Sequence, residues 1–310
     1  MNRAIVTGAT GFIGKFLVRE LLKQKVDVIA VVRENSPNIS EIDSFPIEIV
    51  QCNIENFVSL PEKVVNRNVD AVFHLAWQGI SDLDAKNQRI QLQNLQSTLD
   101  LIDAMREMNI KVFVGAGSLH ELEALVEMQE DKVISNMAYM YKSSKTAAHW
   151  MGKAKAGNMG IKFFWPFINT YGEGEDSARL INTVIKKILR GEEPSLTAGN
   201  QYYDFVHVSD VAHALYLIAK KGVDGTNYVI GSGSPRPLKE FLKKVGEIAN
   251  EVKGGNKVEL GFGRITNNVI SLPKETFDIG NLVRDTGFVP AISFEEGISR
   301  TVDWIKENSK

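Results

Sequence analysis

Short apolar runs alternate with amphipathic stretches through the first half of the chain. The apolar runs have the length and composition of buried strands, and they lie at residues 4–7, 27–33, 47–51, 70–75 and 111–116. In the stretches between them, apolar residues recur with the period of a helix, at residues 12–25, 57–67, 85–109 and 138–157. Strands and helices that alternate in this way predict an α/β fold built on a doubly wound parallel sheet.

The pattern changes near Pro166. Residues 161–165 predict one more strand, and beyond it short helical and strand-like runs are separated by segments rich in Gly, Pro, Ser and Glu. These segments lie at residues 172–175, 191–200, 222–226 and 231–237. We therefore expect a large domain over residues 1–165 and a smaller α/β lobe within residues 166–310. Parts of the second half, such as residues 204–221, are expected to return to the first domain.

Composition narrows the class of protein. The chain has 310 residues, 44% of them hydrophobic, and a formal net charge of −2 without a basic tract, so neither nucleic acid nor an anionic membrane is an expected partner. Cys52 is the single cysteine and the five histidines show no ligand spacing, so we expect no intrachain disulfide and no metal site. No apolar run reaches membrane-spanning length and no signal peptide precedes the first strand, so a cytoplasmic location is expected.

Three glycines follow the first predicted strand in the pattern Gly8-x-x-Gly11-x-x-Gly14, and a helical period continues after them. Gly8 allows a sharp turn, Gly11 lets a ligand approach the backbone, and Gly14 lets helix and strand pack closely. The free N–H groups and the positive dipole end of the helix would then face a pyrophosphate. The alternative is a tight turn without a ligand, but the strand–turn–helix context favours a dinucleotide-binding domain.

The end of the second predicted strand bears on the choice of dinucleotide. An NAD-selective site usually places an acidic residue here to bind the ribose 2′-hydroxyl, whereas this chain has Arg33. Because an arginine can bind a 2′-phosphate, the sequence favours NADP(H), and NAD(H) stays open because Glu34 is adjacent. The alternative is that Arg33 is a solvated loop residue.

Tyr141 and Lys145 lie four residues apart, which places them on one face of a helix. An ammonium beside a phenol lowers the pKa of the phenol, so the tyrosine can exchange a proton with a carbonyl or alcohol oxygen. Ser118, after the fifth predicted strand, can donate a hydrogen bond to that oxygen, or it can cap the next helix. The spacing alone also fits a surface Tyr and Lys, and the glycine motif makes the catalytic interpretation the better one.

Taken together, these motifs resemble the extended short-chain dehydrogenase/reductase family, the NAD-dependent epimerase/dehydratase group, nearly end to end. The elements that carry the resemblance are Gly8-x-x-Gly11-x-x-Gly14, His74-Leu75-Ala76-Trp77, Asn94, Ser118, Tyr141 with Lys145, Asn169-Thr170-Tyr171-Gly172 and Asp204-Phe205-Val206-His207-Val208-Ser209-Asp210. The resemblance implies a Rossmann domain with a small C-terminal substrate lobe, and activity on nucleotide-linked sugars.

The resemblance also implies roles for individual residues. Ser118 would position the substrate oxygen, Tyr141 would be the acid/base, and Lys145 would tune it and bind the nicotinamide ribose. The candidate cofactor ligands are Gly8, Thr10, Gly11, Phe12, Ile13, Gly14, Arg33, Asn53, Ile54, Leu75, Ala76, Trp77, Tyr141, Lys145, Pro166 and Ile168. The candidate substrate ligands are Ser118, His120, Asn169 and Arg179.

The chain departs from the family pattern at several positions. Asn53 stands where the family often has an Asp that binds adenine, and an amide can still pair with that ring. Pro166 stands where an Arg is common, Glu173 replaces a Pro after Tyr171-Gly172, and Leu122-Glu123 replace a Tyr-Gly pair. Most of these changes fall on the substrate side, so they affect the choice of substrate more than the chemistry.

Several other polar residues have two interpretations. His74 ends an apolar strand and His207 precedes a helical pattern, so both are expected to be structural, whereas His120 either reaches the substrate or does not. Arg179 and Arg264 lie in the part of the chain expected to bind a nucleotide diphosphate, where an arginine fork suits phosphate, but solvated arginine is the default. The broad apolar surface of the helix over residues 85–109 suggests a homodimer, as is common in the family.

The function expected from these residues is reduction of a 4-keto-6-deoxy sugar on a CDP or dTDP carrier by NADPH, with Tyr141 as the proton donor. The alternative is a nucleotide-sugar 4-epimerase that keeps its NAD bound. A dehydratase is less favoured, because it commonly has Asp-Glu where this chain has Leu119-His120. An alternative of another class is a non-catalytic NADP-binding regulator, against which the intact Tyr141/Lys145 pair argues.

Overall fold

The computed structural model describes residues 1–66, 68–80, 84–129, 137, 139–175, 177–266 and 270–308. Contacts within the chain divide it into two compact units. The first unit comprises Met1–Ile168, Ala212–Val229 and Gly280–Phe288. The second comprises Asn169–Val211, Ile230–Ile279 and Val289–Lys310, so two later segments of the chain belong to the first unit.

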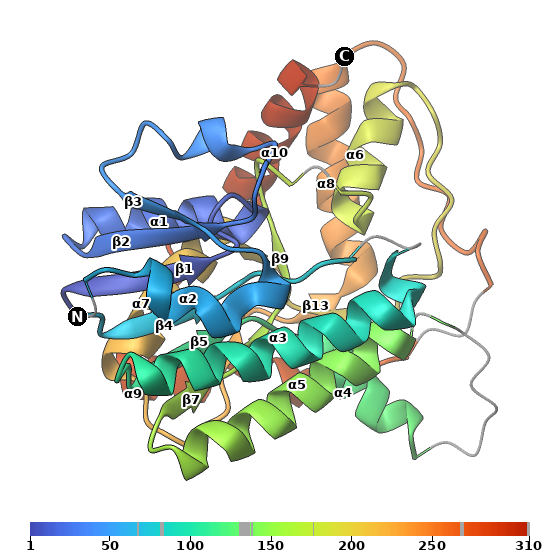
Figure 1. Ribbon diagram of the computed structural model, residues 1–310. Helices are drawn as coiled ribbons and strands as arrows, with labels where there is room; N and C mark the ends of the chain where they lie inside the picture. The colour runs from blue at the N-terminus through green and yellow to red at the C-terminus, as the bar shows by residue number, and fades with distance from the viewer. Residues whose placement is uncertain are drawn as a thin grey trace. The chain divides into compact units, whose positions relative to one another are not determined.

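A six-stranded sheet forms the centre of the first unit (Figure 1). Its strands are β1 (Arg3–Thr7), β2 (Asp27–Val32), β3 (Glu48–Gln51), β4 (Ala71–His74), β5 (Val112–Gly115) and β7 (Lys162–Phe164). They lie in the order β3-β2-β1-β4-β5-β7, and every pair is parallel. This order confirms the expected doubly wound parallel sheet.

The direction in which strands are added reverses between β1 and β4, and ligands of such sheets bind beyond the carboxyl ends of the strands at this point. Thr7, the last residue of β1, pairs with Val31 of β2 and with His74 of β4. The residues that follow these three strands therefore meet at one edge of the sheet. They include Gly8, Arg33 and Leu75.

Helices cover the sheet because its strands are apolar on both faces, as the fully buried Ala4, Ile5, Val6, Val72 and Phe73 show. The elements between the strands are α1 (Phe12–Lys23), η1 (Ile39–Glu41), η2 (Ile54–Ser59), α2 (Leu60–Lys63), η3 (Asp84–Lys86), α3 (Gln88–Glu107), α4 (Leu119–Glu127) and α5 (Tyr139–Asn158). The helices α3 and α5 run side by side along the first unit (Figure 1). The later segments add α9 (Gly280–Thr286) and most of α7 (Val208–Lys221).

Two details of the helix pattern differ from expectation. The helix expected over residues 57–67 ends as α2 at Lys63, because Val64 turns to an extended conformation and enters the core at 1% exposure. The short α4 after Ser118 was expected only under the alternative in which Ser118 caps the next helix. Residues 67 and 138, which two expected helices included, lie outside the described residues.

Three helices form the core of the second unit, α6 (Leu180–Leu189), α8 (Leu238–Lys253) and α10 (Phe294–Asn308), and they contact one another (Figure 1). Their apolar faces bury Ile185, Leu242 and Ile298. The remaining elements are the short strands β6 (Gly117–Ser118), β8 (Phe167–Ile168), β9 (Thr170–Tyr171), β10 (Tyr202–Tyr203), β11 (Val206–His207), β12 (Val229–Ile230) and β13 (Arg236–Pro237), and η4 (Lys274–Phe277). In the first unit β6 pairs with β8; in the second, β9 pairs with β11 and β10 with β13.

Candidate functional site

The glycine motif forms a close turn between β1 and α1. Gly8 has a φ of +71°, and a Cβ built on it would lie 2.7 Å from the backbone nitrogen of Ala76. A Cβ on Gly14 would lie 2.1 Å from the carbonyl oxygen of Gly8, so no side chain fits there either. At Gly11 a Cβ would approach only the Gly8 oxygen, at 3.1 Å. The space over Gly11 is therefore left open to a ligand, whereas Gly8 and Gly14 are required by the protein's own packing.

The first turn of α1 has no side-chain cap and no acidic residue, and Gly11 is its N-cap. The hydroxyl of Thr10 lies 3.1 Å from the Ser36 hydroxyl, which joins the glycine turn to the segment after β2. An uncapped helix start presents amide N–H groups and the positive end of the dipole. These features fit the pyrophosphate of a dinucleotide.

Arg33 is exposed directly after β2, and no described residue forms an ion pair with it. The next residue, Glu34, donates its backbone N–H to the side-chain oxygen of Asn53 at 2.9 Å. This bond holds the ends of β2 and β3 together and leaves the amide NH₂ of Asn53 as a donor. The guanidinium of Arg33 and the amide of Asn53 therefore suit a ribose phosphate and an adenine ring.

Beyond β4, the side chain of Trp77 forms one wall of the candidate site. Its indole N–H donates to the side-chain oxygen of Gln91 at 3.1 Å, which fixes the ring. The preceding His74 is a buried core residue, with its two ring nitrogens 2.9 Å from the Thr7 hydroxyl and 3.1 Å from the Thr98 hydroxyl. Burial lowers the pKa of His74 to about 3, so this histidine is neutral and structural, as expected.

Lys145 is buried, at 5% exposure, and its ammonium lies 3.7 Å from the centroid of the Trp77 ring. The ammonium donates to the carbonyl oxygen of Ala116 at 2.9 Å. Burial lowers the pKa of Lys145 to about 7, and the Glu121 carboxylate opposes that shift. Tyr141 packs edge-on against the same Trp77 ring, with the ring centroids 6.2 Å apart. The structure therefore brings the predicted pair together on one aromatic surface.

Ser118 does cap a helix, since it is the N-cap of α4. Its hydroxyl oxygen accepts the backbone N–H of His120 at 3.3 Å, and the Glu121 side chain accepts the backbone N–H of Ser118 at 2.8 Å. This reciprocal pair is a capping box. Because the hydroxyl is an acceptor in the cap, its own proton is still available for a substrate oxygen, and the two roles considered for Ser118 are compatible.

Glu121 is a buried residue that sequence reasoning missed. Its carboxylate is 2% exposed and also accepts the indole N–H of Trp165 at 3.0 Å, with the His149 ring nitrogen 3.2 Å away. The signal that reveals it is the Ser118-x-x-Glu121 spacing of a capping box. Through these bonds Glu121 ties the serine-bearing turn to α5 and to the strand end at Trp165.

Three more candidates lie near Ser118. The ring of His120 packs edge-on against Tyr141, with centroids 6.2 Å apart. The carbonyl oxygen of Pro166 accepts the N–H of Gly117 at 2.9 Å, and Ile168 pairs with Ser118 in the β6–β8 register. His120 follows Ser118 on α4, and Pro166 and Ile168 belong to the segment that pairs with Gly117 and Ser118.

The candidate substrate ligands in the second unit make their contacts with other groups of this chain. Asn169 donates its side-chain N–H to the carbonyl oxygen of Asp204 at 3.3 Å. Arg179 pairs with Glu175 at 3.2 Å, and Arg264 pairs with Glu193 at 2.7 Å. Both arginines are thus engaged by carboxylates of this chain. The ring of His207 is buried, lies 2.8 Å from a Glu173 oxygen and is structural, as expected.

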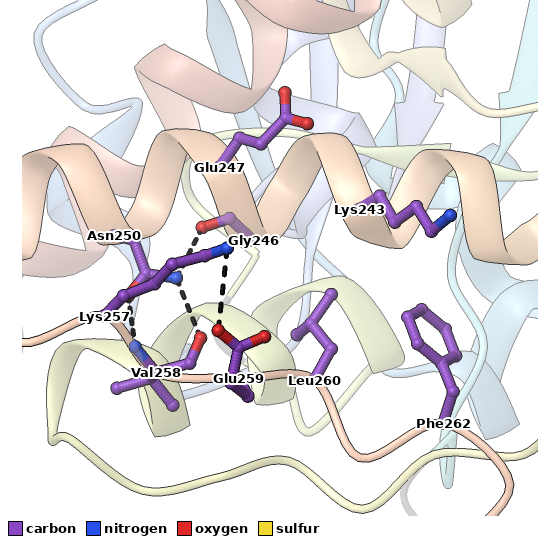
Figure 2. A pocket seen from close by; sticks show the side chains of 9 residues that line it. All are labelled: Lys243, Gly246, Glu247, Asn250, Lys257, Val258, Glu259, Leu260 and Phe262. Carbon is purple, nitrogen blue, oxygen red and sulfur yellow. Dashed lines mark hydrogen bonds and ion pairs between the residues drawn. The ribbon is translucent and has the colours of Figure 1, made fainter.

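A pocket of about 300 Å³ lies in the second unit between α8 and the segment 257–262 (Figure 2). The side chain of Asn250 joins the two walls, because it donates to the carbonyl oxygens of Gly246 and Val258 and accepts the N–H of Val258. The remaining lining residues are Lys243, Glu247, Lys257, Glu259, Leu260 and Phe262. None of the predicted site residues lines this pocket.

Among the described residues, no group of three or more His, Cys, Asp or Glu side chains could hold a metal ion. None of the described helices is both long enough and apolar enough to cross a membrane.

Comparison with known proteins defines the class. The model of the "NAD dependent epimerase/dehydratase family" matches residues 4–231. The chain is 27% identical over 321 residues to a putative UDP-glucose 4-epimerase of Methanocaldococcus jannaschii, covering 99% of each chain. It is 24% identical to the dTDP-glucose 4,6-dehydratase of Neisseria meningitidis serogroup B, covering 99% of this chain and 94% of the relative.

Solved structures agree with the fold. The UDP-glucose 4-epimerase of Thermotoga maritima, solved with UDP-glucose, superimposes with a TM-score of 0.79 at 22% identity, covering 99% of this chain and all of that one. The Bordetella bronchiseptica enzyme WbmF, solved with NAD⁺, gives a TM-score of 0.77 at 23% identity, covering 99% of this chain and 93% of that one. The protein belongs to the NAD-dependent epimerase/dehydratase family and is an enzyme of the extended short-chain dehydrogenase/reductase type. The resemblance identified from the motifs is thereby confirmed.

Proposed function

We propose that the protein reduces the keto group of a 4-keto-6-deoxy nucleotide sugar, on a CDP or dTDP carrier, with NADPH as the hydride donor. The observation that carries this proposal is the convergence of Tyr141 and the buried Lys145 on the ring of Trp77, with Ser118 at the start of the neighbouring helix. The family supplies the class of reaction, and the exposed Arg33 after β2 supports NADPH as the cofactor.

The reduced nicotinamide would supply a hydride to the keto carbon when it is bound. Tyr141 would give its phenolic proton to the keto oxygen, and Ser118 would donate a hydrogen bond to that oxygen as negative charge develops. Burial lowers the pKa of Lys145 to about 7. This lysine would tune the tyrosine and bind the ribose. His120 lies edge-on to Tyr141, and Asn169 and Arg179 of the second unit are the proposed substrate ligands.

The residues present fit a dinucleotide. The turn at Gly8, Gly11 and Gly14 leaves backbone where a side chain would block a phosphate, and the start of α1 is uncapped. Leu75, Ala76 and Trp77 follow β4 at the same sheet edge, with Pro166 and Ile168 beside Ser118. The exposed Arg33 supports NADP(H), because a 2′-phosphate would give it the partner that no described residue supplies.

The second candidate function is a nucleotide-sugar 4-epimerase with tightly held NAD. The observation that favours it is the likeness to the putative UDP-glucose 4-epimerase over 99% of both chains. NAD-bound neighbours such as WbmF also support NAD(H) as the alternative cofactor. An epimerase returns the hydride to its own substrate and consumes no external reductant.

The experiment is to incubate the purified protein with a panel of nucleotide 4-keto sugars and follow NADPH absorbance. We expect consumption of one NADPH for each sugar reduced, and little dinucleotide released when the purified protein is denatured. Near-stoichiometric bound NAD, with interconversion of UDP-sugars that needs no added cofactor, would replace the reductase with the epimerase.

We also propose that the protein is a homodimer. The helices α3 and α5 lie side by side and expose three large apolar side chains, Leu92 on α3 and Trp150 and Met151 on α5. Apolar side chains of this size on adjacent helices are typical of a contact surface between subunits. The molar mass in solution, with Trp150→Glu as the variant expected to shift it to that of a monomer, tests the proposal.

A further inference from the structure

His120 differs from an ordinary surface histidine in what surrounds it. Its side chain is 53% exposed, so the ring reaches solvent on one side. On the other side the ring meets Tyr141 edge-on at 6.2 Å between centroids. Its backbone N–H is fixed on the hydroxyl of Ser118. A titratable ring with one side in solvent therefore packs against the ring of the proposed proton donor.

A carboxylate fixes the orientation of this ring. The Nδ1 atom of His120 lies 2.7 Å from Oε2 of Glu123, one turn further along α4. The same oxygen lies 3.1 Å from the ammonium of Lys142 on α5, which in turn pairs with Glu127 at 3.0 Å. Burial raises the pKa of Glu123, but the hydrogen bond and charges of His120 and Lys142 outweigh it and leave that pKa below its ordinary value. An ionised Glu123 keeps the proton of the ring on Nδ1.

Nε2 is then the nitrogen of His120 that can exchange protons, and within the described part of the chain no hydrogen bond engages it. Among the described residues, the titratable groups in contact with the ring are Glu123 on its own helix and Tyr141 on α5, and Lys142 of α5 pairs with the same Glu123 oxygen. The charge of Lys142 is balanced by its ion pairs with Glu123 and Glu127.

We propose that His120, oriented by Glu123, restores the proton that Tyr141 gives to the substrate in each turnover. This inference rests on the proposed reductase, in which the substrate leaves with the proton of the tyrosine. The phenolate oxygen of Tyr141 takes a proton from Nε2 of His120, directly or through a water molecule, and Nε2 takes one from solvent. Nδ1–H stays on Glu123 throughout, and no electron is transferred.

This role predicts an effect on repeated turnovers and not on the first. Tyr141 begins protonated, so the first hydride transfer needs no shuttle, whereas every later one does. At saturating nucleotide 4-keto sugar, stopped-flow NADPH absorbance should show a first turnover in His120→Ala within about twofold of the wild type. The later turnovers should be slowed about tenfold or more, and added imidazole should restore part of the loss.

The chain provides a matched control in His213. Its ring also has Nδ1 near a glutamate, 2.8 Å from Oε1 of Glu20, and also lies beside a tyrosine, Tyr216. His213→Ala should leave both kinetic phases unchanged, with or without imidazole. Glu123→Gln should slow the later turnovers less than His120→Ala, because the ring remains but loses its fixed orientation.

Three results would overturn the shuttle. The first is a steady-state rate of NADPH consumption that is unchanged in His120→Ala. The second is a first turnover slowed as much as the later ones, which would make His120 a substrate ligand. The third is an absence of imidazole rescue in a folded variant with intact NADPH binding. A wild-type protein that consumes no NADPH with any sugar of the panel is a different result. It would overturn the reductase proposal, before any His120 variant is compared.

Discussion

The Tyr-x-x-x-Lys spacing occurs on two helices of the first unit, with opposite patterns of burial. On α7, Tyr216 is 4% exposed, Lys220 is exposed, and the ammonium donates directly to the phenol oxygen at 2.9 Å. On α5, Lys145 is buried over Trp77 and Tyr141 is partly accessible. The spacing brings the two side chains together in both places. The chemistry we propose needs the lysine buried and the tyrosine accessible, and only α5 provides that arrangement.

The largest expected difference between the two pairs follows removal of the phenol oxygen. Tyr141→Phe should lower turnover on the order of a hundredfold or more, because the proton donor is lost, and should leave NADPH affinity nearly unchanged. Tyr216→Phe should leave turnover unchanged and reduce the free energy of unfolding by about 1 kcal/mol, for the lost hydrogen bond. NADPH absorbance, cofactor titration and urea unfolding measure these effects. A Tyr141→Phe variant that keeps more than about a tenth of the rate would remove Tyr141 from the acid/base role.

Exchanging the lysines sharpens the same comparison. Lys145→Met should impair both turnover and cofactor affinity, since the ammonium lies against Trp77 and is expected to reach the ribose. Each loss should be about tenfold or more, the size of a charged hydrogen bond. Lys220→Met, on the exposed end of α7, should change neither. Unaltered NADPH binding in Lys145→Met would show that this lysine does not contact the cofactor.

Much of this arrangement could be predicted from the sequence. The apolar runs predicted the strands of the parallel sheet. The glycine motif and the Tyr141/Lys145 pair predicted the family, which the comparisons confirmed. What the spacing could not supply was burial. Glu121 is buried through bonds to His149 and Trp165, which are 28 and 44 residues further along the chain. The local pattern also could not show that the helix expected over residues 57–67 ends before Val64, because Val64 is buried in the core by packing against distant parts of the chain.

Two substitutions of Ser118 distinguish its role as a helix cap from its proposed role as a hydrogen-bond donor to the substrate. Ser118→Ala removes both the cap and the hydroxyl, so the free energy of unfolding should fall by about 1 kcal/mol and turnover on the order of a hundredfold. Ser118→Gly removes the hydroxyl but costs only a few tenths of a kcal/mol as a cap. It should therefore be nearly as stable as the wild type and as inactive as the alanine variant. If the glycine variant keeps its activity, the serine is only a helix cap.

The last substitution concerns cofactor choice at the end of β2. NADPH should bind the wild type more tightly than NADH, and Arg33→Ala should narrow that gap by about 1–3 kcal/mol, the size of a charge-assisted hydrogen bond. Arg106→Ala, on α3, serves as the control for loss of a positive charge and should leave the difference between the NADPH and NADH affinities unchanged. Tighter NADH binding by the wild type would contradict the 2′-phosphate assignment and strengthen the epimerase alternative.

The buried lysine is the central claim, and its titration tests that claim most directly. Burial lowers the folded pKa of Lys145 to about 7 from an ordinary value of 10.5. Between these values the unfolded chain holds a proton that the folded one has lost, so the free energy of unfolding should rise with pH by about 1.4 kcal/mol per unit in this window. That rise should be absent in Lys145→Met. The decisive measurement is the NMR titration of ¹³C-labelled lysines, with the Lys145 signal assigned from Lys145→Met. A midpoint near 7 is the predicted result, and a Lys145 that titrates with its ordinary pKa would contradict the account.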